Sequence, residues 1–178
     1  FFRYDGGYTV PITSEVSDFV FTNMNESQRS KVWAVVNGQY NEVWWFYPSS
    51  SSTEIDSYVA YNFENGTWTV GTLARTAGVD AGSFQNPIWA STDSYIYEHE
   101  TGFNYDSQVP FAESGALQIG DGDRLMNVQE LIPDERTLGQ TTVQFKTANF
   151  PTGTETSSSV FSMANPTSVR ISARQVRL

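Results

Sequence analysis

The chain has 178 residues, 15% of them aromatic, and its 20 acidic side chains against 10 lysines and arginines give a net charge of −10. Its length fits one compact domain or two small ones. The absence of cysteine excludes disulfides and cysteine-ligated zinc. His99 is the single histidine, which excludes a multi-histidine metal site. The charge argues against a nucleic-acid-binding surface, and no apolar run is long enough to span a bilayer.

Four strands are predicted in the first half of the chain, at 31–36, 42–47, 57–63 and 68–73. Asn-Gly pairs at 37–38 and 65–66 are typical of tight hairpin turns, so we expect one antiparallel meander. Both faces of 42–47 are apolar, which predicts a central strand covered on two sides. The serine run at 49–52 predicts a flexible surface loop.

Further strands are predicted at 88–91, 95–98, 124–132, 141–146 and 169–178, with a loop around 151–159. No stretch of 12 residues has a helical period, and the best helical candidate, 25–30, is a single turn. The predicted fold class is all-β, with antiparallel meanders that resemble β-propeller blades and a β-sandwich as the alternative.

The predicted organisation is a propeller-like blade region at 1–106 and a second β region at 107–178, or one continuous domain. Alternating residues continue to the end of the chain at 169–178. We therefore expect a fragment of a longer protein, truncated at its C-terminus.

The segment 119–124, Ile-Gly-Asp-Gly-Asp-Arg, has the aspartate spacing of a calcium-binding loop. Such a loop needs Asn or Asp at its fifth position, Gly at its sixth and Glu at its twelfth. The chain has Leu125, Met126 and Ile132 at these positions. The segment is therefore interpreted as a tight turn before a strand, and no metal site is predicted.

His99 lies between Glu98 and Glu100, and carboxylates of this kind can tune a histidine as a general base. In a strand, however, Glu98 and Glu100 point to one side and His99 to the other. The chain has no Gly-x-Ser-x-Gly nucleophile turn and no glycine-rich phosphate loop with its lysine. We therefore predict neither an enzyme nor a cofactor, with a triad assembled from distant residues left as the alternative.

Five tryptophans and 20 acidic residues also allow a carbohydrate-binding or glycoside-cleaving β-propeller module. The tryptophans are Trp33, Trp44, Trp45, Trp68 and Trp89, and they lie in or beside predicted strands, which favours core positions for most of them. The carbohydrate alternative gains if several of them line an open groove beside two close carboxylates, and it loses if they are buried between sheets.

The segment 41–48, Asn-Glu-Val-Trp-Trp-Phe-Tyr-Pro, resembles bacteriophage tail proteins of the nozzle and packaged-DNA-stabilisation type. In that family a similar segment precedes a serine-rich loop and a stretch like 56–68. Further similar segments occur in order at 71–76, 96–102, 120–124, 132–134 and 170–175. Together they extend over roughly residues 15–178, with Ala173 where family members often have glycine. Family members continue beyond this point.

The resemblance implies a structural virion protein, a ring-forming nozzle or head-to-tail component around the DNA exit channel of a short-tailed phage. It implies a homo-oligomeric ring that contacts other tail, adaptor or portal proteins, located in the virion after assembly in the bacterial host cytoplasm. No catalytic residue carries over from the family.

An acidic chain fits a channel through which DNA slides without tight binding, because each lysine–phosphate contact adds affinity. Asp121, Asp123, Asp134 and Glu135 gather in the second half of the sequence. These four residues are the predicted channel-facing acids.

Overall fold

The computed structural model describes residues 1–102, 109–134 and 140–178, and the chain divides into two compact units, Phe1–Phe103 and Asn104–Leu178. With 42% strand against 10% helix and several antiparallel sheets, it confirms the predicted all-β fold class. The described residues form no closed barrel or propeller. None of their helices is long and apolar enough to cross a membrane.

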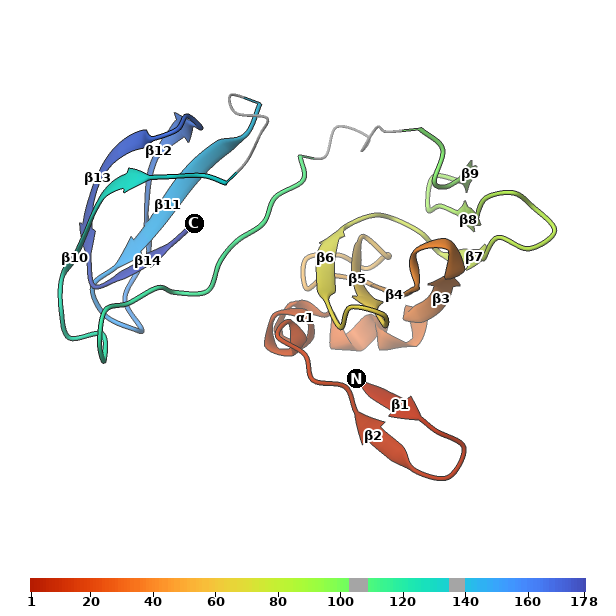
Figure 1. Cartoon of the computed structure of the whole chain (residues 1–178). Helices are drawn as coiled ribbons and strands as arrows, with labels where there is room; N and C mark the ends of the chain where they lie inside the picture. Colours follow the sequence, from red (N-terminus) through yellow and green to blue (C-terminus); the bar gives the residue numbers. More distant parts are fainter. Residues whose placement is uncertain (103–108, 135–139) are drawn as a thin grey trace. The chain divides into compact units, whose positions relative to one another are not determined.

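Unit 1 contains three antiparallel sheets, of two, four and three strands (Figure 1). In chain order the elements are β1 (Phe2–Tyr4), β2 (Thr9–Pro11), α1 (Ser17–Asn23), the 3₁₀-helix η1 (Glu26–Lys31), β3 (Trp33–Asn37), the 3₁₀-helix η2 (Gly38–Tyr40), β4 (Glu42–Tyr47), β5 (Ser57–Asn62), β6 (Trp68–Thr72), β7 (Ala77–Val79), β8 (Ile88–Ala90) and β9 (Ile96–Glu98). The sheets are β1-β2, β3-β4-β5-β6 and β7-β8-β9.

The four-stranded sheet confirms the predicted meander, and β4 is an inner strand with an apolar cluster on each face. The Trp89 cluster consists of Val35, Phe46, Ile55 and Trp89, with Trp33, Trp44, Tyr58 and Leu73 packed against them. The Val20 cluster consists of Val20, Tyr47 and Val59, with Phe1, Val16, Met24, Trp45, Trp68 and Val70 packed against them. Alternation along β4 sends Trp44 and Phe46 to one cluster and Trp45 and Tyr47 to the other.

The hairpin turn between β3 and β4 is present, but its left-handed residue is not in the Asn-Gly pair predicted at 37–38. Asn37 and Glu42 form the last strand pair, and η2 with Asn41 makes the connection. The left-handed backbone falls on Asn41, at φ 58°, which asparagine tolerates better than most residues. Asn37 is instead fully buried, because its side chain bonds to a distant segment of unit 1.

The turn predicted at 65–66 is confirmed. Gly66 has φ 72°, a value that favours glycine. Upstream, the Asn62 side-chain oxygen accepts hydrogen bonds from the backbone N–H groups of Glu64 and Asn65. These bonds fix the chain reversal between β5 and β6.

The serine run at 49–52 lies partly at the surface as predicted, since Ser50 and Ser51 are exposed, but hydrogen bonds hold both of its ends. Ser49 is buried, and both its backbone N–H and its hydroxyl donate to the Asp56 carboxylate at 2.7 Å. The Asn25 side chain donates to the Ser52 carbonyl at 2.8 Å. Composition suggested mobility, but these bonds fasten the loop to its neighbours.

Helix α1 was not predicted, because its seven residues are too short to display a helical period. It buries Val20 in the cluster named after that residue, while Phe19 and Phe21 stay exposed. The single turn predicted at 25–30 corresponds to η1, which Asn25 caps by accepting a hydrogen bond from the backbone N–H of Ser27.

Unit 2 contains a two-stranded sheet, β10-β13, and a three-stranded sheet, β12-β11-β14, all antiparallel. The strands are β10 (Met126–Leu131), β11 (Thr142–Ala148), β12 (Thr156–Ser162), β13 (Thr167–Ala173) and β14 (Gln175–Arg177). Both sheets contribute to one core of Val143, Phe145, Val169, Ala173 and Val176. Figure 1 shows them as the blue and teal part of the chain.

Two details of unit 2 correct the sequence prediction. The predicted loop around 151–159 contains the first half of β12, which consists of one threonine and three serines and lacks the apolar alternation of the other strands. The predicted strand 169–178 is divided between β13, which pairs with β10, and β14, which pairs with β11. The chain changes sheets at Arg174.

Candidate functional site

The predicted channel-facing acids do not form one cluster. Asp121 and Asp123 share an exposed turn before β10, in which Gly120 and Gly122 have φ 61° and 79°, as the predicted tight turn requires. Asp134, also exposed, follows the other end of β10, a strand of six residues or about 20 Å. Glu135 lies outside the described residues.

None of the five tryptophans is exposed. Trp89 is 1% exposed, and Trp44 lies between it and Tyr58, with ring centroids 5.4 and 4.4 Å away. On the other face of the sheet, Trp45 and Trp68 pack around Phe1. The tryptophans therefore belong to the two apolar clusters and do not form an open platform.

A polar group borders the Trp89 cluster at the end of the β3–β4 hairpin. The Asn37 side-chain N–H donates to one oxygen of Glu100 at 2.8 Å. The Trp44 indole N–H donates to one oxygen of Glu42, also at 2.8 Å. Because Asn37 and Glu42 are directly opposite each other in the antiparallel pair, their side chains lie on the same sheet face.

The electrostatics of this polar group are unfavourable for a charged Glu42. Burial raises its pKa, and the nearby negative charge of Glu100 raises it further, while the hydrogen bond from Trp44 acts in the opposite direction. Glu100 itself has a left-handed backbone, at φ 60°, which is uncommon outside glycine and asparagine. Two carboxylates are thus associated with one buried amide, Glu100 through its hydrogen bond from Asn37 and Glu42 through its strand pairing with Asn37.

His99 is packed close to this group through a different set of contacts. Its Nε2 atom accepts a hydrogen bond from Nε of the buried Arg75 at 2.9 Å. Its ring lies 4.0 Å from that of Trp89, centroid to centroid, and the Arg75 guanidinium carbon lies 4.3 Å from the centre of the Tyr97 ring.

The strand alternation predicted for 98–100 is wrong beyond Glu98, because β9 ends at that residue. Glu98 and Glu100 then bond to different partners, Asn86 and Asn37 respectively. The two carboxylates therefore do not flank His99 as a pair.

The loop after β7 adds a third acidic side chain to this edge of unit 1. Asp80 accepts the backbone N–H of Gly38 at 3.1 and 3.2 Å through its two oxygens. A Cβ atom at Gly38 would lie 2.8 Å from one of these oxygens, so a larger residue here would displace the Asp80 carboxylate.

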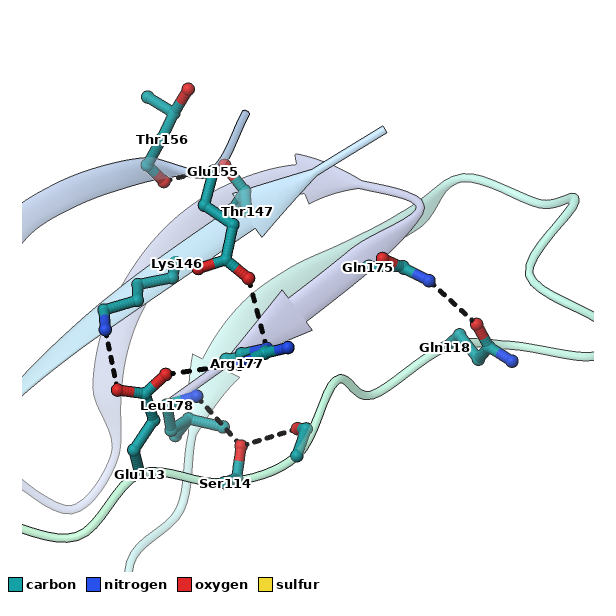
Figure 2. A network of polar contacts seen from close by, with 11 residues as sticks. Glu113, Ser114, Gln118, Lys146, Thr147, Glu155, Thr156, Gln175, Arg177 and Leu178 are labelled. Carbon is teal, nitrogen blue, oxygen red and sulfur yellow. Dashed lines mark hydrogen bonds and ion pairs between the residues drawn. The ribbon is translucent and has the colours of Figure 1, made fainter. Parts of the chain in front are cut away.

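Unit 2 has its own polar network, shown in Figure 2. Glu113 lies between Lys146 of β11 and Arg177 of β14, at 2.6 and 3.5 Å, and Arg177 also contacts Glu155 at 3.2 Å. These contacts lower the pKa of Glu113, chiefly through the hydrogen bond from Lys146. The alternating charges fasten the segment near Glu113 to the edge of the three-stranded sheet.

The sequence did not single out Asn37, Glu42 and Glu100 together. Asn37 was interpreted as a turn residue and Glu100 as a neighbour of His99, and nothing in the sequence places 98–100 beside β3. A usable signal was the acidic Glu42 at the start of an otherwise apolar strand.

Within 1–102, 109–134 and 140–178, no three histidine or carboxylate side chains come together as a metal-binding group. No protein-family model matches the chain, and no curated protein is significantly similar to it.

Proposed function

We propose that this chain is a structural virion protein of a bacteriophage tail, a ring-forming nozzle or head-to-tail component around the DNA exit channel. In this proposal copies of the chain form a ring that contacts other tail, adaptor or portal proteins in the virion. The ring assembles in the cytoplasm of the bacterial host. Its inner wall lets DNA pass without binding it tightly.

The observation that carries the proposal is a set of exposed acidic side chains without cationic partners. The exposed Asp121, Asp123 and Asp134 form no ion pair with any described residue. In a chain with a net charge of −10, such carboxylates repel phosphates. A channel wall with this charge favours sliding of DNA over binding.

The segment with the strongest resemblance to phage tail proteins has a structural role in the fold. Residues 44–47 lie in β4 and fill the two apolar clusters of the four-stranded sheet. This placement suits a scaffold protein. The carbohydrate alternative has less support, because the tryptophans it would use for stacking are packed in these same clusters.

Ring formation is the first test of the proposal. Negative-stain electron microscopy and analytical ultracentrifugation of the chain at increasing concentration are expected to reveal closed rings of uniform size. A chain that stays monomeric throughout contradicts the proposal.

DNA binding is the second test. We expect no change in the anisotropy of a labelled duplex at about 50 mM salt, where contacts with phosphates are strong. The matched control replaces Asp121, Asp123 and Asp134 by lysine, which is expected to create binding that weakens as salt increases. Micromolar, salt-sensitive binding by the unmodified chain contradicts a sliding channel.

A further inference from the structure

The polar group at Asn37, Glu42 and Glu100 has three side-chain oxygens without a hydrogen-bond donor in the described part of the chain. Glu42 uses one oxygen to accept from Trp44, and Glu100 uses one to accept from Asn37. The second oxygen of each carboxylate accepts no described hydrogen bond. The third oxygen is Oδ1 of Asn37, which has no partner.

Asn37 is the observation that points to a ligand. It is 0% exposed, and its amide nitrogen is committed to Glu100, so its oxygen is enclosed without a donor. A buried polar atom without a partner costs roughly 1–3 kcal/mol and calls for an explanation. Asn37 bonds to Glu100 and lies directly opposite Glu42 in the strand pair, so these two glutamates are the nearest place to seek the explanation.

The charge of the group points to a cation. Glu42 and Glu100 are close enough to repel each other, and neither forms an ion pair with a described lysine or arginine. Carboxylate and amide oxygens are the ligands preferred by hard divalent cations, and calcium completes its shell of 6–8 oxygens with water.

We propose that Glu42, Glu100 and Asn37 Oδ1 bind a hard divalent cation, with calcium preferred, which fastens the β3–β4 hairpin to the segment after β9. The site has two carboxylates and one amide, so only two of its protein ligands are charged. Its dissociation constant is expected at the weak end of calcium sites, roughly 10⁻⁴–10⁻³ M. The site does not depend on the proposed tail function, so failure of either leaves the other intact.

Terbium(III), a calcium analogue whose emission is sensitised by nearby indole rings, is a suitable probe. The Trp44 indole bonds directly to Glu42 and would lie beside a bound ion. We expect saturable terbium emission on tryptophan excitation of the full chain, at about 150 mM salt to screen nonspecific binding by its acidic surface. Calcium added in excess is expected to displace the terbium.

The variants Glu42→Gln and Glu100→Gln keep a side-chain oxygen for Trp44 and Asn37, so the fold is expected to survive. Each is expected to weaken terbium and calcium binding about ten-fold or more, because a charged ligand is lost. The matched control is Glu98→Gln, since Glu98 is exposed and bonds to Asn86 instead. Equal binding by all variants overturns the proposal.

Asn37→Asp tests the site by gain of affinity. A third carboxylate is expected to destabilise the chain in a chelator and to tighten calcium binding about ten-fold. Calcium is then expected to raise the unfolding temperature of this variant more than that of the original chain. Two results together contradict a cation site: no saturable terbium emission, and no rise in the unfolding temperature of Asn37→Asp when calcium is added. The two glutamates would then coexist because one of them is protonated.

Discussion

Unit 1 contains all five tryptophans of the chain, whereas unit 2 contains none. In unit 1 aromatic rings cover both faces of one sheet, and β4 has no solvent-facing side. In unit 2 two sheets share a single core of aliphatic side chains around Phe145, and an ion-pair network fastens the edge of one of them. The comparison shows two ways to stabilise antiparallel sheets, by aromatic burial on both faces and by one core with charged edges.

The comparison is most directly tested by deleting one buried phenylalanine from each unit. Phe46 of unit 1 and Phe145 of unit 2 are 0% and 1% exposed. Either change to alanine is expected to destabilise its own unit by about 3–5 kcal/mol, since it leaves a cavity in a packed core.

Urea unfolding followed by two signals separates the two effects. Tryptophan fluorescence reports only unit 1, whereas far-ultraviolet circular dichroism reports both units. Phe46→Ala is expected to lower the fluorescence midpoint, and Phe145→Ala is expected to leave it unchanged while part of the dichroism signal unfolds earlier. An equal shift of the fluorescence midpoint by both variants would mean that the units unfold as one.

A second prediction tests the aromatic packing of unit 1 at Gly78, which pairs across the sheet with Trp89. A Cβ atom at Gly78 would lie 2.3 Å from Cδ1 of the Trp89 ring. Because Trp89 is buried and has no room to move, Gly78→Ala is expected to cost about 1–3 kcal/mol through overpacking.

The matched control for Gly78 is Gly82→Ala, where a Cβ atom would meet nothing within 4 Å. This variant is expected to be neutral or stabilised by up to about 1 kcal/mol. Thermal unfolding of both variants gives the comparison. Equal stability of the two variants contradicts the close contact between Gly78 and Trp89.

The sequence predicted the four-stranded sheet of unit 1 better than β1, β2 and β7 of the same unit or β12 of unit 2, for a physical reason. Double-sided burial made β4 apolar at nearly every position, so 42–47 was recognisable without knowing its neighbours. Strand β12 has an exposed face and an irregular register with β11, and its serines resemble a loop.

The candidate site was predicted least well, because it depends on contacts between distant residues. Asn37 and Glu100 are 63 positions apart, and no local pattern announces their hydrogen bond. The same bond explains why the left-handed residue is not in the Asn-Gly pair at 37–38, since it buries the asparagine that was expected to occupy a tight turn. Turn propensity describes the isolated hairpin, and the tertiary contact overrides it.

A third prediction concerns the pH dependence of unit 1. The pKa of Glu42 is raised in the folded chain, so its proton is held more tightly there than in the unfolded chain. The folded state is therefore favoured below the unfolded pKa, and this advantage is lost as the pH rises through the raised folded pKa.

Glu42→Gln removes this dependence. In a chelator, its stability relative to the original chain is expected to increase from about pH 4 to neutrality and then level off. The effect is expected to be smaller than those of the core variants, because Glu42 is only half-buried. Urea midpoints from tryptophan fluorescence, measured across this range, give the curve. A relative stability that falls with increasing pH contradicts the raised pKa.

The smallest expected effect belongs to the ion-pair network of unit 2. The pKa of Glu113 is lowered, so its ion pairs stabilise the fold above the unfolded pKa and are lost as the pH falls. Its side chain is 30% exposed, and ion pairs of this kind contribute at most about 1 kcal/mol. Glu113→Gln is therefore expected to lower the stability of unit 2 by less than that amount near neutrality, and by almost nothing near pH 3 or in molar salt.

The matched control is Glu54→Gln, which removes the isolated pair with Lys31, where the glutamate is 61% exposed. Because Glu54 has one cationic partner and is more exposed than Glu113, its replacement is expected to lower the stability even less. Far-ultraviolet dichroism in urea measures both variants. If Glu113→Gln and Glu54→Gln have the same effect at low salt, the two cations around Glu113 do not act together, and the edge of the unit 2 sheet depends on its backbone hydrogen bonds instead.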